Sequence, residues 1–476
     1  MEEDFKLLQE KVKKCDSLVE DLNREFSDAD VDECFQVISE LIPAFRKKLT
    51  SALQKTKKRV FSSVLQRWGN NIRSYDTPVE PKEKEISMYA PACLARKINQ
   101  FVKLIHRKNK NNDDYTHIVI DALRNPYEVL FFREKYAAFY LMSINTSEQL
   151  RRDILIERGY DRFTITDLDE KESDNKSFTN SYQEIDINKC IELSDIFVTH
   201  DGSNYRENRK LNNQIITYLA LIRHPGLVPP SPMERIMQIA YTAKLNSGCL
   251  SRQVGAVVTN ANYSVQAVGW NTVAQGQTPC SLRCLTDLMS GEDPVAYSEF
   301  EKQDTVFHKS TTLLNDKYKA AKDSLIGLPN AYCFKDIHTR TAQKQRFNQV
   351  HTRALHAEEN AFLQLAKYGT EGIKGGKLFT TSSCCELCGK KAYQLGIKEI
   401  FYIDSYPGIT QQHILGCGES RPKMVLFHGA IGRAYSNLYN PFVPFKDELE
   451  ALSGVSVKEL LDSENRKTTN VTSDNK

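Results

Sequence analysis

Two short motifs constrain this chain more than any other feature. They are RALHAEENAF, which contains His356 and Glu358, and TTSSCCELCGKK, which contains Cys385 and Cys388. The segment after the His has helix-forming composition, and the Cys pair opens a second helix that lies between two strand-like runs. Residues 356–404 are therefore predicted to form a helix-strand-helix-strand unit that contains one site.

The residue types of these motifs favour zinc chemistry. One imidazole and two thiolates suit Zn²⁺ and leave a fourth position for water, as in catalytic rather than structural sites. The helix N-terminus at Cys385 and Cys388 stabilises thiolates. The sequence predicts ligands His356, Cys385 and Cys388, with Glu358 moving the proton of the attacking water. A structural zinc site or a redox thiol pair is the alternative.

The bulk properties predict a soluble globular protein of two or three domains. The chain has 476 residues with 40% hydrophobic content, and no apolar run approaches the length of a membrane helix. Its N-terminus is charged and helical, unlike a signal peptide, so a cytoplasmic location is expected. The twelve cysteines indicate reduced thiols. Four isolated ones are expected in cores: Cys15, Cys34, Cys93 and Cys190.

Positive charge is concentrated in the N-terminal half, although the net charge is only +3. Residues 46–73 contain nine Lys or Arg and no acid, and residues 96–110 contain six and no acid. Such segments bind polyanions by counterion release, or they form solvated helix faces. Contact with nucleic acid is thus one of two interpretations of these segments.

An alternating pattern in the N-terminal half predicts a parallel α/β sheet. Residues 1–75 have helical periodicity, and strand-like runs follow at 115–123, before residue 146, and at 194–203, with a helix after the first. The first run ends in Asp121, but the chain contains no G-x-x-x-x-G-K-[ST] loop. Nucleotide hydrolysis is therefore not expected, and Asp121 is interpreted as a strand-end or capping residue.

A Pro-, Gly- and Ser-containing linker at 223–235 predicts a domain boundary. After the helix that follows it, the run from 254 to 270 predicts a β-hairpin around Asn-Ala-Asn. Residues 285–350 are interpreted as a polar, irregular insertion. The predicted domains are 1–225, 230–455 and a disordered tail at 456–476.

Residues 230–445 resemble the cytidine and deoxycytidylate deaminase superfamily. The resemblance lies in SRQVGAVV, GWN, HAEENA and CELC, and H-x-E with P-C-x-x-C is the signature of zinc nucleobase deaminases. It implies an α/β fold with an α/β/α three-layer domain, a mixed sheet, a Zn²⁺ cofactor and the ligands and proton shuttle predicted above. It also implies substrate contacts at Asn271, which meets the sugar in that family, and at Ala357.

The chain departs from that family pattern at one position. Cys384 replaces the usual Pro before the first Cys of the pair, which removes a preset helix entry and adds a competing thiol. Cys385 is still the expected ligand, because only it has the x-x spacing to Cys388. A second metal is also possible, since some deoxycytidylate deaminases hold a structural zinc in the region that contains Cys249, Cys280, Cys284, Cys333 and His338.

The wider chain resembles bacterial antiphage deaminases of deoxycytidine nucleotides. VIDALRNPYEVLFFREKYAAFYLMSIN, PCSLRC, IDSYPGI and GAIGRAYSNLY are similar to members with an N-terminal P-loop kinase-like α/β domain. Here that domain is truncated and lacks the loop, so a separate P-loop partner is one expectation, and a homo-oligomer is another.

The sequence supports three functions. The first is conversion of dCTP or dCMP to the deoxyuridine nucleotide and ammonia, in antiphage defence by dCTP depletion. The second is deamination of cytosine in single-stranded DNA or RNA, which the basic segments favour. The third is a regulatory or nucleic-acid-sensing protein with an inactive zinc fold, against which the intact Glu358 argues.

Overall fold

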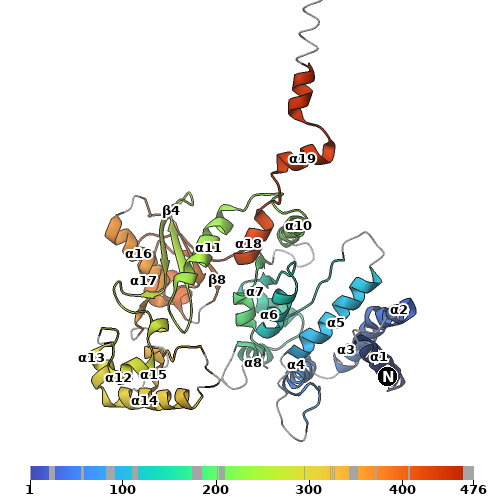
Figure 1. Cartoon of the computed structure of the whole chain (residues 1–476), viewed down its shortest axis with the longest axis horizontal. Helices are drawn as coiled ribbons and strands as arrows, with labels where there is room; N and C mark the ends of the chain where they lie inside the picture. The colour runs from blue at the N-terminus through green and yellow to red at the C-terminus, as the bar shows by residue number, and fades with distance from the viewer. Residues whose placement is uncertain are drawn as a thin grey trace, which may run out of the picture. The chain divides into compact units, whose positions relative to one another are not determined.

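The computed structural model describes most of the chain, in fifteen ranges. They are 2–20, 27–54, 58–81, 92–109, 116–173, 185–200, 202, 209–293, 295–321, 323, 325, 327–341, 352–369, 372–405 and 408–464. The chain divides into two compact units (Figure 1). Unit 1 contains Met1–Leu141 and Ser147–Ser194, and unit 2 contains Met142–Thr146 and Asp195–Lys476.

Unit 1 is helical throughout its described secondary structure. Its elements are α1 (Glu2–Glu20), α2 (Asp28–Gln36), a π-helical turn η1 (Val37–Leu41), α3 (Ile42–Gln54), α4 (Lys58–Tyr75), α5 (Cys93–Lys108), α6 (Pro126–Lys135), α7 (Glu148–Glu157), α8 (Arg162–Ser173) and α9 (Ile187–Glu192). The predicted helical periodicity of residues 1–75 is confirmed there. All four isolated cysteines are buried, as expected.

The strand predicted at 115–123 is wrong for residues 116–123. They adopt no regular structure, Val119 is 93% exposed, and Asp121 is exposed too. None of the described strands pairs with this segment, and the parallel pair is formed by β1 (Met142–Asn145) and β2 (Ile196–Thr199). Asp121 is thus not a strand-end residue, and the cap of the next helix is Asn125, whose side chain accepts from the Tyr127 and Glu128 amides.

A small sheet in unit 2 confirms part of the predicted α/β pattern. β1 and β2 are parallel, and β10 (Gly429–Ala430) pairs antiparallel with β2. The Glu234 carboxylate accepts hydrogen bonds from the Ala430 amide and from the hydroxyls of Tyr218 and Tyr439. These bonds join α10 (Arg209–Arg223), α11 (Pro232–Ala243) and α18 (Gly432–Tyr439), so the compact units divide earlier than the predicted linker boundary.

The main sheet of unit 2 is mixed, with strand order β4-β3-β7-β8-β9. The strands are β3 (Gly255–Thr259), β4 (Val265–Trp270), β7 (Lys377–Ser382), β8 (Glu399–Asp404) and β9 (Lys423–Leu426). β3 is antiparallel to β4 and β7, which confirms the predicted hairpin, whereas β7, β8 and β9 are parallel.

Helices cover both faces of this sheet, and two glycines show how closely they approach. A Cβ on Gly255 would lie 2.0 Å from the Ala240 carbonyl oxygen of α11, and one on Gly269 would lie 2.3 Å from the Ala357 carbonyl oxygen of α16 (Ala357–Tyr368). Gly269 pairs with the residue after Gly255, so the two glycines face opposite sides. α11 and α16 therefore lie on opposite faces, which confirms the three-layer α/β/α arrangement.

The remaining elements complete unit 2. They are η3 (Lys244–Asn246), β5 (Thr272–Val273), η4 (Cys280–Leu282), β6 (Ala354–Leu355), α17 (Glu386–Gln394), the π-helical turn η7 (Thr410–Leu415) and α19 (Phe445–Ser453). Residues 457–464 are helical as well, so the predicted disordered tail does not begin at 456. Residues 465–476 lie outside the described residues. No helix in the described ranges combines the length and apolarity needed to cross a membrane.

The insertion predicted as irregular is largely helical, which corrects that expectation. It forms α12 (Leu285–Ser290), α13 (Glu299–Gln303), α14 (Thr305–Ala320) and α15 (Phe334–Thr341), while 342–350 lie outside the described residues. These short helices bury a core of their own that includes Leu285, Leu288, Tyr297, Phe307 and Tyr332. Three of the four helices have only five to eight residues, so no long helical repeat of apolar positions indicates them along the chain.

Candidate active site

Two helix N-termini place the residues of the two motifs. His356 is the N-cap of α16, with extended backbone at φ −71° and ψ 155°. Cys385 is the N-cap of α17, and Cys388 lies in the first turn of that helix. α17 connects the parallel strands β7 and β8, so the predicted helix-strand-helix-strand unit is confirmed.

The three predicted ligands converge. Among the residues that the structure describes, only His356, Cys385 and Cys388 form a group whose ligand atoms all lie within 4.8 Å of one another. His356 Nδ1 is 3.3 Å from Cys385 Sγ and 3.5 Å from Cys388 Sγ. Tetrahedral zinc with Zn–N of about 2.0 Å and Zn–S of about 2.3 Å needs an N···S separation of about 3.5 Å. The donor set therefore fits Zn²⁺ in both chemistry and spacing.

The electrostatics of this group favour metal binding. A hydrogen bond from the Cys388 thiol, together with one from His356, lowers the pKa of Cys385 to about 4. The same bond raises the pKa of Cys388, since its proton is shared with Cys385. The hydrogen bond to Cys385 also raises the pKa of His356. One thiolate is thus already favoured before a cation arrives, and binding the metal displaces the remaining proton.

Glu358 lies in the first turn of α16, beside this group, and is only 4% exposed. Burial raises the pKa of its carboxyl group, and this effect outweighs the opposing charge of His356. Thr380 Oγ1 lies 3.5 Å from Glu358 Oε1. A buried carboxyl group with a raised pKa is suited to taking up and releasing protons near neutral pH.

Cys384, the departure from the family pattern, is not in the ligand group. It is 2% exposed and lies between the end of β7 and the N-cap of α17. Burial, followed by the charges of Glu358 and Cys385, raises the pKa of Cys384. The structure thus places Cys385 rather than Cys384 among the ligands, in line with the x-x spacing.

One cavity of about 150 Å³ opens onto this site. His356, Ala357, Glu358 and Cys385 line it, together with Asn271. The Asn271 side chain accepts from the Val254 amide at 2.7 Å and donates to the Arg252 carbonyl at 2.7 Å. Asn271 therefore fixes the segment before β3 and also faces the cavity, where the resemblance placed a sugar contact.

Three basic residues of the cavity were not expected from the sequence. Arg252, Lys335 and Arg353 line it, and they come from the segment before β3, from α15 and from the segment before β6. Arg252 forms an ion pair with Asp404, and Arg353 donates to the Thr278 carbonyl at 3.2 Å. Arg353 lies only three positions before His356. This nearness to His356 is the one feature of the sequence that indicates a cavity position for Arg353. Lys335 has no such indication, because it belongs to the insertion that was interpreted as irregular.

The residues suggested for a second metal do not form a ligand group in the structure. Cys249, Cys280 and Cys333 line the same cavity without meeting the geometry of the first group. Cys284 instead caps α12, with its sulfur accepting from the Asp287 amide, and the His338 ring stacks on Phe334. Cys284 and His338 thus already have structural roles. The prediction of a second metal therefore finds no support in the described residues.

Comparisons with known proteins agree with this geometry. Residues 230–404 match the family model described as the cytidine and deoxycytidylate deaminase zinc-binding region. The deoxycytidylate deaminase of Enterobacteria phage T4 is 28% identical over 172 residues, which cover 36% of this chain and 77% of that protein. The deoxycytidylate deaminase of Schizosaccharomyces pombe is 27% identical over 215 residues, covering 45% of this chain and 48% of that protein.

A solved structure of dCMP deaminase from the cyanophage S-TIM5 is similar to 42% of this chain over its whole length, with 20% identity and a TM-score of 0.24. None of these matches includes the greater part of the chain. The match to the zinc-binding region covers residues 230–404, and within it His356, Cys385 and Cys388 form the group that fits the metal.

Proposed function

We propose that this protein is a zinc-dependent hydrolase that deaminates the cytosine base of a free deoxycytidine nucleotide, dCTP or dCMP. The observation that carries the proposal is the convergence of the three ligands at a cavity that His356, Cys385 and the buried Glu358 line. When bound, Zn²⁺ lowers the pKa of a water molecule toward neutrality. The products are the deoxyuridine nucleotide and ammonia.

Glu358 moves the protons of this reaction. It takes a proton from the attacking water and delivers it to N3 of the base while the C4–O bond forms. It then takes the proton of the new hydroxyl group and gives it to the amino group, so that the C4–N bond breaks and ammonia leaves. The raised pKa of Glu358 suits both uptake and release of that proton.

A phosphate-bearing substrate is supported by the charges around the cavity. Arg252, Lys335 and Arg353 line it, while Glu358 is the only carboxylate among its described lining residues. Basic side chains at the cavity wall attract an anionic substrate and bind its phosphate oxygens. Ala357 and Asn271 are proposed as substrate contacts near the base and the sugar.

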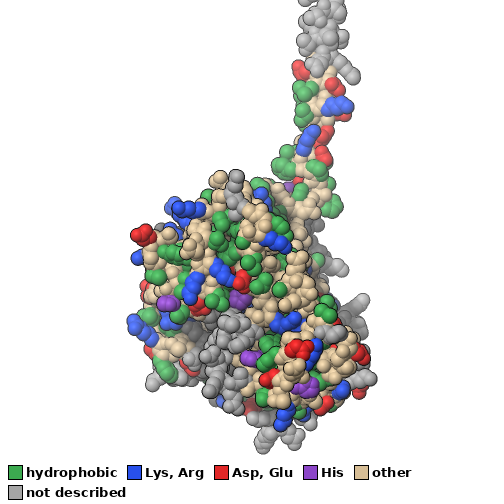
Figure 2. Space-filling view, turned by 90° about the vertical axis from the view of Figure 1, so that its left-hand side faces the viewer, with side chains coloured by type: hydrophobic (Ala, Val, Ile, Leu, Met, Phe, Trp, Pro, Cys, Tyr) green, Lys and Arg blue, Asp and Glu red, His purple; other side chains and the backbone are tan. Residues whose placement is uncertain are grey.

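Deamination within a polynucleotide is the second candidate, and one observation favours it. Lys103, His106, Arg107 and Lys135 line a hollow in unit 1, with Tyr136 beside them. This hollow contains part of the basic segment at 96–110. Figure 2 shows the side of the molecule on which α16 and α17 lie in Figure 1, and there Lys and Arg side chains lie among hydrophobic and acidic ones.

One assay separates the two candidates. The full chain is incubated with dCTP, dCMP, CTP and a cytosine-containing single-stranded oligonucleotide, and ammonia release and product mass are measured. Glu358→Ala is the control, and zinc content is measured for both proteins. We expect turnover of a deoxynucleotide by the parent alone, with zinc in both. Turnover of the oligonucleotide alone would overturn the proposal in favour of a polynucleotide enzyme.

The proposed biological role is antiphage defence through dCTP depletion, supported by the sequence resemblance of the wider chain. Bacteria that express the parent chain should then plate a DNA phage less efficiently than bacteria that express Glu358→Ala. Equal plating at equal protein levels would contradict this role. A homo-oligomer and a separate P-loop partner also stay predictions of that resemblance.

A further inference from the structure

We propose that Lys335 determines the specificity of this site for nucleotides by binding a phosphate group of the substrate. The proposal rests on the proposed deaminase function and deepens it, because it assigns the phosphate contact to one side chain of the cavity. A nucleotide with a 5′-phosphate is then bound tightly, whereas deoxycytidine, which has no phosphate, is bound weakly. Lys335 belongs to the helical insertion, outside the motifs that supply the metal ligands.

The three basic residues of the cavity differ in how many of their donors are free. Arg252 forms an ion pair with Asp404, and Arg353 Nη1 donates to the Thr278 carbonyl at 3.2 Å. Lys335 forms no hydrogen bond or ion pair with any residue in the described ranges, although it lines the same cavity. A guanidinium that already holds an oxygen atom must share its donors with a phosphate, whereas the three ammonium protons of Lys335 are all available.

The cavity that Lys335 lines also reaches the reacting groups. His356, Glu358 and Cys385 line it as well, and Glu358 is the only carboxylate among its described lining residues. The Lys335 side chain is half-buried, so its charge is less screened by water than that of an exposed lysine. One cavity therefore offers a zinc-binding group for the base and an unpaired cation for the phosphate.

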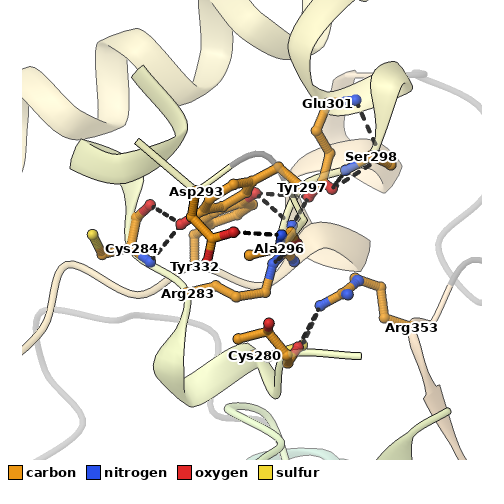
Figure 3. Close-up of polar contacts among 11 residues, drawn as sticks. Cys280, Arg283, Cys284, Asp293, Ala296, Tyr297, Ser298, Glu301, Tyr332 and Arg353 are labelled. Atoms are coloured by element: carbon orange, nitrogen blue, oxygen red, sulfur yellow. Dashed lines mark hydrogen bonds and ion pairs between the residues drawn. The ribbon is translucent and has the colours of Figure 1, made fainter. Parts of the chain in front are cut away.

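A buried ion pair of the insertion fixes the segment that leads into α15. Arg283 Nη2 donates to the Glu301 carboxylate and, at 3.1 Å, to the Tyr332 hydroxyl oxygen (Figure 3). The Tyr332 hydroxyl donates to Glu301 at 2.7 Å. The Leu285 amide donates to the Asn330 carbonyl at 2.9 Å. The backbone just before α15 is thus held by both side-chain and main-chain bonds.

Two further contacts fix the start of α15 at the cavity wall. Cys333 Sγ lies 3.6 Å from Ser251 Oγ, which joins the insertion to the segment before β3. The Phe334 ring packs 5.1 Å from the ring of Phe307 in the core of the insertion. Lys335 is therefore presented from a fixed backbone. A cation on a fixed backbone loses less conformational entropy on binding a phosphate than one on a mobile loop.

The binding test uses the zinc-loaded full chain with Glu358→Ala, which prevents turnover. The Kd values of dCMP, dCTP and deoxycytidine are measured by calorimetry with and without Lys335→Met. Loss of one charge-assisted contact should weaken nucleotide binding by about 10- to 100-fold. Deoxycytidine binding and zinc content should not change, which also shows that the variant is folded.

Two further variants make this test specific. Lys319→Met removes an exposed lysine of the same insertion, so it is matched in charge and should leave all three Kd values unchanged. Lys335→Arg keeps the cation and should restore most of the nucleotide affinity. In the active parent, Lys335→Met should raise KM for the nucleotide by the same factor and leave kcat nearly unchanged, because the phosphate contact is the same in the ground state and the transition state.

The outcomes separate this inference from the proposed function. If the parent binds nucleotides through Lys335 but turns none over, the proposed function fails while the phosphate contact stands. If the parent is active and Lys335→Met leaves nucleotide binding unchanged, or weakens deoxycytidine binding equally, phosphate binding by Lys335 is wrong while the function stands. A loss of affinity for dCTP but not for dCMP supports the proposal and assigns the contact to the outer phosphates.

Discussion

Glu301 and Glu358 are both buried carboxyl groups of unit 2, yet the protein shifts their pKa values in opposite directions. Glu301 is 1% exposed and Glu358 is 4% exposed. The pKa of Glu301 is lowered and that of Glu358 is raised. Burial raises the pKa of both carboxyl groups, so the lowered pKa of Glu301 must come from the groups around it.

Glu301 has a complete set of donors (Figure 3). Arg283 Nη2 donates to it, as do the Tyr332 hydroxyl at 2.7 Å and the Ser298 amide at 2.9 Å. Burial alone would raise the pKa of Glu301, but these donors outweigh it. The Arg283 guanidinium also lies over the rings of Tyr297 and Tyr332. This carboxylate is held in its charged form and stabilises the helical insertion.

Glu358 has weaker partners, namely its own backbone amide and the distant hydroxyl of Thr380. Burial is the largest influence on its pKa, and the neighbouring donors do not outweigh it. A buried carboxylate with charged donors therefore serves stability, whereas one with weak donors remains available for proton transfer.

The largest effect that tests this comparison is on catalysis. Glu358→Gln should lower kcat by about 10²–10⁴-fold, because the proton shuttle is lost. The free energy of unfolding should stay the same or rise, since a buried ionisable group is removed. Steady-state kinetics and chemical denaturation measure the two quantities. The control is Glu359→Gln, which changes the neighbouring carboxylate that pairs with Lys391. A large loss of stability in Glu358→Gln would show that this carboxylate has a structural role.

The second prediction concerns the stability of the insertion, where a somewhat smaller effect is expected. Arg283→Met leaves Glu301 buried without its cation and should lower the free energy of unfolding by about 3–5 kcal/mol. Urea denaturation measures the change. Lys302→Met is the matched control, because it breaks an exposed pair with Glu299 and should cost about 0–1 kcal/mol. If Arg283→Met costs no more than this control, the buried ion pair does not stabilise the insertion.

The smallest effect concerns pH. The unfolded glutamate titrates near pH 4.5, and the folded pKa of Glu301 is lower. Its contribution to stability is therefore present above pH 4.5 and is lost as the pH falls through the folded pKa. The stability difference between the parent and Glu301→Gln should shrink as the pH falls below about 4.5. Urea denaturation over this range measures it, and a difference that stays constant or grows would show that the folded pKa is not lowered.

Much of the catalytic region could be predicted from the sequence. The H-x-E and C-x-x-C spacings follow directly from helix and strand periodicity, so local geometry alone brings His356 near Glu358 and Cys385 near Cys388. The hairpin at β3 and β4 was predictable for the same reason. The absence of a strand at 116–123 was not, because strand formation requires a partner that alternation along one segment does not reveal.

The sequence by itself determined the metal-binding residues, their chemistry and the helix-strand-helix-strand unit around them, because these depend on residue types and on helix and strand periodicity along one stretch of the chain. Only the tertiary structure decided that Lys335 of the insertion lines the cavity and that Glu301 is paired with Arg283. Each of these depends on which side chains meet after the layers pack, and on how far water is then excluded from them.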